Sequence, residues 1–153
     1  MSKGRATVTG GSGFLGSHVV DALCAAGYRV SIFDHKDSSH RTPEQEMIIG
    51  DILDAEQVSD AIAGSDLVYH FAGMADIHMT NERPIDAVKC NILGTANILG
   101  ACEKANVSRF VFASSVYVYS DQGGVYRTTK QASELLIENY AKLFGLDFTI
   151  LRF

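Results

Sequence analysis

Tyr126 and Lys130 are the two residues of this sequence best placed to perform acid–base chemistry. They stand four residues apart at the start of a predicted helix, which puts both side chains on the same face. A tyrosine phenol has an unperturbed pKa of about 10, and a neighbouring ammonium that stabilises the phenolate is expected to lower that pKa. Such a pair also arises by chance in many helices, so a solvated helix face is the alternative interpretation.

The position of this pair in the chain favours the catalytic interpretation. The apolar run Arg109–Ala113 predicts a strand that ends on Ser114 and Ser115, and the helix that carries the pair follows and extends to Phe144. Open α/β sheets bind their ligands at the carboxyl ends of the strands. A serine hydroxyl there, from Ser115 or Ser114, could hold a substrate oxygen beside the phenol, and the lysine could donate to a nicotinamide ribose.

A glycine-rich stretch near the N-terminus has the spacing of a dinucleotide-binding turn. It lies between a β-prone run at residues 6–8 and a segment with apolar residues at helical spacing. Gly10 and Gly11 can adopt the positive φ that a tight strand-to-helix turn needs. Gly13 leaves the helix N-terminus bare for a pyrophosphate, and Gly16 lets the helix pack closely against the strand. An ordinary glycine-rich turn is the alternative, whereas a kinase-type P-loop is excluded because no glycine-lysine-serine/threonine sequence follows.

The second predicted strand, Arg29–Phe33, ends on Asp34, which lies 18 residues past Gly16. A carboxylate at that position can accept hydrogen bonds from both ribose hydroxyls of an adenosine and disfavours a 2′-phosphate. The sequence therefore predicts NAD as the cofactor in preference to NADP, with His35 and Lys36 as the residues that could reverse this preference.

Strands and helices alternate along the rest of the chain, which predicts right-handed βαβ crossovers. The fold class expected is α/β, a doubly wound parallel sheet (Rossmann) with strand order 3-2-1-4-5-6 and a ligand crevice between strands 1 and 4. Asn91 lies inside a predicted long helix, and the pattern leaves a buried or a solvent-facing side chain equally open. The other predicted elements are a polar loop over 35–44, strands at Gln45–Ile49, Leu67–Phe71 and Leu146–Phe153, a helix from Asp54, the long helix from Pro84, and loops at Met74–Arg83 and Val116–Gly124.

Composition limits the classes of function. The 153 residues suit one domain with a hydrophobic core, and a net charge of −5 without a basic cluster argues against nucleic-acid binding. No apolar run is long enough for a membrane span, and no histidine or cysteine spacing predicts a metal site. Three scattered cysteines, Cys24, Cys90 and Cys102, are typical of thiols in a reducing cytoplasm, so a cytoplasmic location is expected.

Taken together, five stretches resemble the extended short-chain dehydrogenase/reductases, in particular the NAD-dependent epimerase/dehydratase group typified by UDP-glucose 4-epimerase. The stretches span nearly the whole chain: residues 9–18 (TGGSGFLGSH), 50–52 (GDI), 70–73 (HFAG), 91–97 (NILGTAN), and 112–115 (FASS) together with 126–130 (YRTTK). The resemblance implies an oxidoreductase that transfers hydride transiently between bound NAD and a nucleotide sugar.

The resemblance also assigns roles to residues. Ser115 matches the family's catalytic serine or threonine, Tyr126 its general base and Lys130 its cofactor-orienting lysine. A homodimer through the helices that hold Asn91 and Tyr126 is the common arrangement in the family. The cofactor-binding residues expected from the motif and the resemblance together are Gly10, Gly13, Phe14, Leu15, Gly16, Asp34, Asp51, Ile52, Phe71, Ala72, Gly73, Asn91, Tyr126 and Lys130.

Two departures from the family pattern bear on function. The segment between Ser115 and Tyr126 is short and contains Gly123-Gly124 where the family has a longer, proline-containing loop that borders the substrate. The chain also ends at residues 151–153, whereas family members continue into a portion that closes over the sugar nucleotide. We therefore expect residues 1–153 to be an NAD-binding domain without that C-terminal portion. A non-catalytic NAD-binding module is the alternative function.

Overall fold

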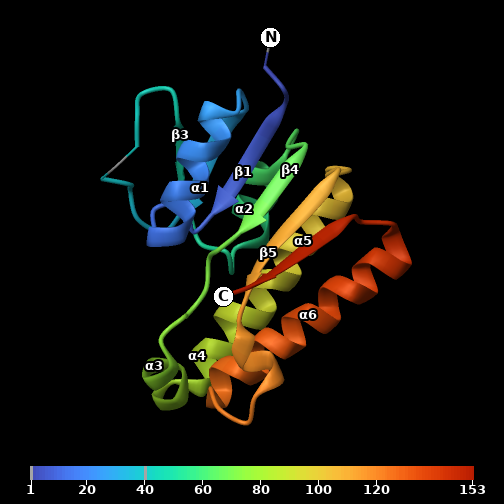
Figure 1. Ribbon diagram of the computed structural model, residues 1–153. Helices are drawn as coiled ribbons and strands as arrows, with labels where there is room; N and C mark the ends of the chain where they lie inside the picture. The colour runs from blue at the N-terminus through green and yellow to red at the C-terminus, as the bar shows by residue number, and fades with distance from the viewer. Residues whose placement is uncertain (1, 40) are drawn as a thin grey trace.

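The computed structural model describes residues 2–39 and 41–153. The predicted loop over 35–44 includes residue 40, which lies outside the described residues. Six strands form one all-parallel sheet in the order β3-β2-β1-β4-β5-β6, which confirms the fold class and the strand order expected from the sequence (Figure 1). The strands are β1 (Arg5–Thr9), β2 (Arg29–Asp34), β3 (Glu46–Ile49), β4 (Leu67–His70), β5 (Arg109–Ser114) and β6 (Phe148–Arg152).

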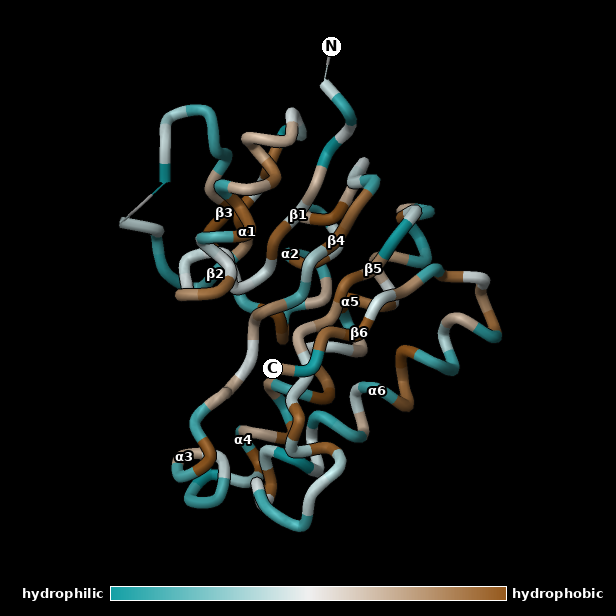
Figure 2. Tube along the Cα trace, viewed as in Figure 1, coloured by the Kyte–Doolittle hydropathy of each residue, from teal (hydrophilic) through white to brown (hydrophobic). Residues whose placement is uncertain are grey.

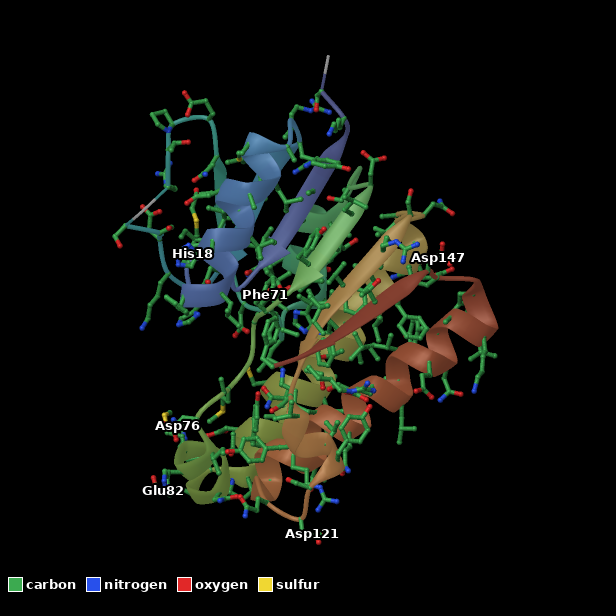
Figure 3. All side chains as sticks on the ribbon, viewed as in Figure 1. His18, Phe71, Asp76, Glu82, Asp121 and Asp147 are labelled. Carbon is green, nitrogen blue, oxygen red and sulfur yellow. The ribbon has the colours of Figure 1, made fainter. Side chains whose placement is uncertain are left out.

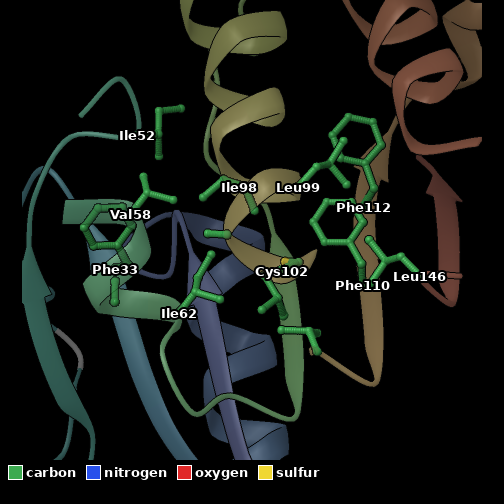
Figure 4. Packing of buried hydrophobic residues seen from close by; sticks show 14 of the residues in the cluster. Phe33, Ile52, Val58, Ile62, Ile98, Leu99, Cys102, Phe110, Phe112 and Leu146 are labelled. Atoms are coloured by element: carbon green, nitrogen blue, oxygen red, sulfur yellow. The ribbon is translucent and has the colours of Figure 1, made fainter. Parts of the chain in front are cut away.

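Helices cover both faces of this sheet. On one face, α1 (Phe14–Ala25) packs Val20 and Leu23 against apolar residues of β1 and β2. On the other face, α2 (Ala55–Ile62), α5 (Gly94–Lys104) and α6 (Gly124–Phe144) enclose a larger core (Figure 4). That core contains three phenylalanines from the sheet, Phe33, Phe110 and Phe112. Burial of this apolar surface is the main driving force for the fold.

The strands are apolar along most of their length because parallel sheets are covered on both faces. Figure 2 shows apolar residues concentrated along β1 and β5 and polar residues in the loop between β2 and β3. The register pairs Thr9, the last residue of β1, with His70, the last residue of β4. Two polar side chains therefore meet where the sheet ends and the ligand crevice begins.

The helix predicted from Pro84 consists of three consecutive segments: α4 (Pro84–Val88), a π-helical segment (Lys89–Leu93) and α5. The carbonyl of Asn91 accepts hydrogen bonds from the hydroxyls of Thr95 and Ser133. Hydroxyls that insert in this way compete with the regular backbone ladder, which is a known cause of local distortion in helices. The partner Ser133 lies on α6, so the sequence of the long helix alone could not predict the interruption.

The two predicted loops contain short helices. Residues 74–83 include α3 (Ile77–Glu82), whose N-cap Asp76 accepts a hydrogen bond from the amide of Met79. Residues 116–124 include a 3₁₀ turn (Val116–Tyr119). The helix that was expected from residue 126 or 127 begins at Gly124, and Gly145 ends it in the left-handed conformation, as predicted. No helix within residues 2–39 and 41–153 has the length and apolar character to cross a membrane.

Candidate functional site

The glycine turn connects β1 to α1 at the carboxyl edge of the sheet. Gly10 has a φ of +70°, and a Cβ on it would lie 2.5 Å from the amide nitrogen of Ala72. A Cβ on Gly16 would collide with the carbonyl oxygen of Gly10, so the helix can approach the turn only with glycine there. Gly11 does not have a positive φ. A larger residue is excluded there because its Cβ would lie 2.9 Å from Cγ2 of Ile32. The sequence-based reason given for Gly11 was therefore wrong.

The first turn of α1 is built to receive an anion. Its N-cap, Gly13, makes no side-chain capping bond. The first N–H groups of a helix have no partner within the helix and carry the positive end of the helix dipole, which suits a pyrophosphate. A Cβ on Gly13 would contact the Gly10 carbonyl alone among the described residues, so the side facing the cavity stays open. This arrangement agrees with the predicted role of the stretch.

Asp34 lies at the end of β2 beside this turn. Its carboxylate accepts hydrogen bonds from the amides of Ser12, at 3.1 Å, and Lys36, at 3.3 Å. Nδ1 of His35 lies 3.0 Å from the Asp34 carboxylate. Asp34 also lines a cavity of about 440 Å³ together with Asp51 and Ile52. The cavity volume is within the range of small-molecule sites, and the role of Asp34 at the adenosine ribose stays a prediction.

A second cavity, of about 340 Å³, holds the residues with acid–base potential. Ser115, Tyr126 and Lys130 line it, together with the glycine turn. The two cavities share the same boundary residues: Gly10, Gly13, Phe71 and Gly73. They therefore form one continuous trough across the carboxyl ends of β1 and β4, where the strand order reverses. Figure 3 labels Phe71, which follows the last residue of β4.

Lys130 is 6% exposed and fixed by its surroundings. Its Nζ donates to the carbonyl oxygen of Ala113 at 2.8 Å and lies 4.7 Å from the ring centroid of Phe112. Burial lowers the pKa of Lys130 to about 8, against the opposing influence of Cys90 and Glu134. The amine is therefore still mostly protonated at neutral pH, and it sits in an environment that makes its charge costly.

The phenol of Tyr126 behaves differently from the expectation. Burial raises the pKa of Tyr126, the neighbouring Ser115 hydroxyl opposes that rise, and Tyr117 adds to it. Lys130 is not among the causes of this shift: its Nζ donates to the carbonyl of Ala113 and lies 5.8 Å from the centroid of the Tyr126 ring. The sequence-based prediction of a lowered pKa was therefore wrong.

The two serines at the end of β5 are not equivalent. The Ser114 hydroxyl donates to Oε1 of Glu134 at 2.5 Å. Glu134 is also held by a bidentate ion pair with Arg152, with N–O distances of 3.0 and 2.7 Å. The Ser115 hydroxyl makes longer bonds: it donates to the carbonyl oxygen of Phe153 at 3.4 Å and accepts from the amide of Tyr117, also at 3.4 Å. Ser115 is therefore the serine with hydrogen-bonding capacity left for a ligand.

Asn91 is the one predicted site residue that lines neither cavity. It is 2% exposed, so its side chain is buried and not solvent-facing. Its amide oxygen accepts from the Met74 amide at 2.7 Å, and its amide nitrogen donates to the Met74 carbonyl and to Oγ1 of Thr129. Asn91 therefore fixes the backbone that crosses beside the trough and ties it to α6.

Sequence reasoning missed a buried polar chain beneath the trough. The His70 ring connects two threonines: its Nδ1 lies 2.6 Å from the hydroxyl of Thr9, and its Nε2 lies 3.0 Å from the hydroxyl of Thr95. Because the Thr95 hydroxyl donates to the Asn91 carbonyl, it must accept from Nε2, so His70 carries its proton there and accepts at Nδ1. Burial lowers the pKa of His70 to about 3, with Lys130 adding to the effect, so the ring is neutral. The Thr9–His70 strand register is the signal that could have indicated this contact.

The fold and the trough define a dinucleotide-binding domain of the doubly wound α/β class. Residues 6–153 match the NAD dependent epimerase/dehydratase family, and the chain belongs to it. This match confirms the resemblance stated above, and the family's NAD dependence confirms the predicted cofactor. Among the described residues, no group of three or more histidine, cysteine or acidic side chains is arranged to hold a metal ion.

Three relatives illustrate the range of the similarity. A Thermotoga maritima UDP-glucose 4-epimerase, solved with UDP-glucose, is 27% identical over 97% of this chain and 54% of its own, with a TM-score of 0.91. A Thermus thermophilus UDP-glucose 4-epimerase in complex with NAD is 29% identical over 97% of this chain and 54% of its own, with a TM-score of 0.88. A 3-beta-hydroxysteroid dehydrogenase of Mycolicibacterium neoaurum is 37% identical over 73% of this chain and 32% of its own. The chain thus spans about a third to a half of the length of these relatives.

Proposed function

We propose that this chain is the NAD-binding domain of an oxidoreductase that exchanges hydride with a hydroxyl-bearing carbon of a nucleotide sugar. The observation that carries the proposal is the shared trough, in which Ser115, Tyr126 and Lys130 face the same space as the glycine turn. Bound NAD supplies the hydride acceptor, and its cationic ring favours a nearby phenolate. The similarity to a UDP-glucose-bound epimerase supports the nucleotide sugar as substrate class.

The three residues have distinct roles in this proposal. Tyr126 is the general base that takes the hydroxyl proton, and Ser115 donates to the same substrate oxygen and holds it in place. Lys130 donates to the nicotinamide ribose and keeps a positive charge beside the phenol. Its bond to the Ala113 carbonyl orients the amine without neutralising it. Epimerisation, dehydration and reduction share this hydride exchange, so the proposal covers all three.

A second candidate is a module that binds NAD without turnover. The chain spans about half the length of the solved relatives, and this candidate concerns residues 1–153 alone. In both candidates residues 1–153 form the NAD-binding domain. The first candidate then describes the whole protein, and the second describes the activity of this chain alone.

The test combines binding with a single-turnover assay. We expect saturable NAD binding by residues 1–153 in calorimetry, with little or no turnover. In the whole protein we expect formation of NADH, followed by its absorbance, when UDP-glucose or UDP-galactose is added. Tyr126→Phe is expected to abolish NADH formation while NAD still binds, whereas the control Tyr140→Phe, in the same helix, keeps both. NADH formation with a 3β-hydroxysteroid and not with the sugars would refute the substrate class. NAD binding without hydride transfer to any of these compounds would favour the binding module.

We also propose a homodimer through the helices that hold Asn91 and Tyr126, in a cytoplasmic protein. Support for the dimer comes from exposed apolar side chains on these helices, including Ile85, 67% exposed, and Leu135, 60% exposed. Support for the location comes from the three free cysteines. Light scattering tests the dimer: Leu135→Lys should shift the mass towards the monomer, and a wild-type protein that is monomeric at high concentration would refute it.

A further inference from the structure

The start of α6 has an unusual conformation. Gly123 and Gly124 both have positive φ, of +96° and +51°, and Gly123 makes no side-chain capping bond as the N-cap. The first backbone bond within the helix is from the amide of Arg127 to the carbonyl of Gly123, at 3.1 Å. The amides that precede Arg127 therefore need acceptors from outside the helix. Tyr126 belongs to this first turn.

Asn81 of α3 supplies one of these acceptors. Its Oδ1 accepts a hydrogen bond from the amide of Val125 at 3.0 Å, although the two residues are 44 apart in the sequence. A Cβ on Gly124 would collide with this Oδ1, so the side chain of Asn81 occupies the space that the glycine leaves. The contact is thus an N-cap from another helix, and the second glycine is what makes room for it.

The segment that carries Asn81 is held at its beginning and within its length. At its beginning, Met74 is clamped by the buried Asn91 through two hydrogen bonds. Within it, Asp76 caps α3, and Thr80, next to Asn81, is fully buried. Figure 3 shows Asp76 and Glu82 on the small helix α3 near the start of α6. Asn81 is therefore presented on a fixed element and not on a mobile loop tip.

We propose that Asn81 is a positioning residue for Tyr126. By capping the first turn of α6 from α3, it holds the phenol inside the trough beside Ser115. The segment before α6 is short and ends in two glycines, so it offers the helix no side-chain cap of its own. This inference rests on the proposed function for the meaning of Tyr126, and the geometry of the cap is independent of it.

Two measurements on the ligand-free chain test the proposal: hydrogen exchange of the Val125 and Tyr126 amides, and the phenol pKa of Tyr126 from carbon NMR of labelled tyrosine. Loss of one N-cap is expected to speed the exchange about tenfold in Asn81→Ala. The pKa of Tyr126 is expected to fall towards its ordinary value as the ring gains access to water. Asn81→Asp keeps an acceptor oxygen and should restore both values.

The control is Asn139→Ala, an exposed asparagine later in α6, which should change neither quantity. Unchanged exchange and pKa in Asn81→Ala would overturn the proposal, as would an Asn81→Asp protein that behaves like Asn81→Ala. A faster exchange with an unchanged Tyr126 pKa would also overturn it, because the cap would then serve the helix and not the phenol. Both readouts need no NAD or substrate, so a failure of the proposed hydride transfer would be seen separately in the single-turnover assay.

Discussion

Replacing Lys130 with methionine is expected to stabilise the ligand-free protein at neutral pH. Burial lowers the pKa of Lys130 from its ordinary value of 10.5 to about 8. Since each pKa unit corresponds to about 1.4 kcal/mol, burying the ammonium costs about 3 kcal/mol at any pH below 8. Methionine has a similar length and no charge, and it loses the bond to the Ala113 carbonyl, which is worth about 1 kcal/mol. The net expectation is a gain of about 2 kcal/mol at pH 7.

The dependence of this gain on pH identifies its cause. Between pH 8 and 10.5 the unfolded chain binds the lysine proton more tightly than the folded chain, so the wild-type protein becomes more stable as the pH rises. The advantage of Lys130→Met should therefore be constant from pH 6 to 8 and shrink above pH 8. The titration of Tyr126 is present in both proteins and largely cancels in the difference. Lys130 lowers the pKa of Cys90, so the titration of Cys90 moves to higher pH in Lys130→Met.

The assay is urea unfolding of the wild type and Lys130→Met at several pH values from 6 to 10, followed by circular dichroism. The matched control is Lys142→Met, an exposed lysine in the last turn of α6, for which no such pH dependence is expected. A Lys130→Met protein that is less stable at pH 7, or whose stability difference from the wild type does not change above pH 8, would refute the reasoning.

Three further changes have defined outcomes. In calorimetry, Asp34→Ala should weaken NAD binding by about 10- to 100-fold and NADP binding by less, because a charged hydrogen-bond acceptor is lost from the ribose position. Equal weakening of NAD and NADP binding would contradict this expectation. In urea unfolding, Gly16→Ala should destabilise the protein by more than about 2 kcal/mol, because the added Cβ collides with backbone atoms. The control Gly100→Ala should be neutral or stabilising by up to about 1 kcal/mol. Asn91→Ala should cost about 2 to 3 kcal/mol and speed amide exchange at Met74, whose backbone loses both partners; unchanged exchange there would contradict the clamp.

Local sequence determined the sheet and most of the trough. The glycine spacing, the acid at the end of the second strand and the alternation of strands and helices each act within one βαβ unit, so their consequences follow from short-range geometry. For this reason the strand order is correct, and Gly10, Gly16 and Asp34 line the trough. Asp51 and Ile52, expected from the family resemblance, also line the trough.

Only the tertiary structure decided which contacts hold the elements around the trough in place and which pKa values its side chains have. The π-helical interruption depends on a hydroxyl 42 residues away, and the cap on α6 on an asparagine 44 residues away. The pKa of Tyr126 is raised by burial of the phenol, against the hydrogen bond with Ser115. Desolvation and hydrogen-bond partners are properties of the packed molecule, so no spacing rule along the chain could have supplied them.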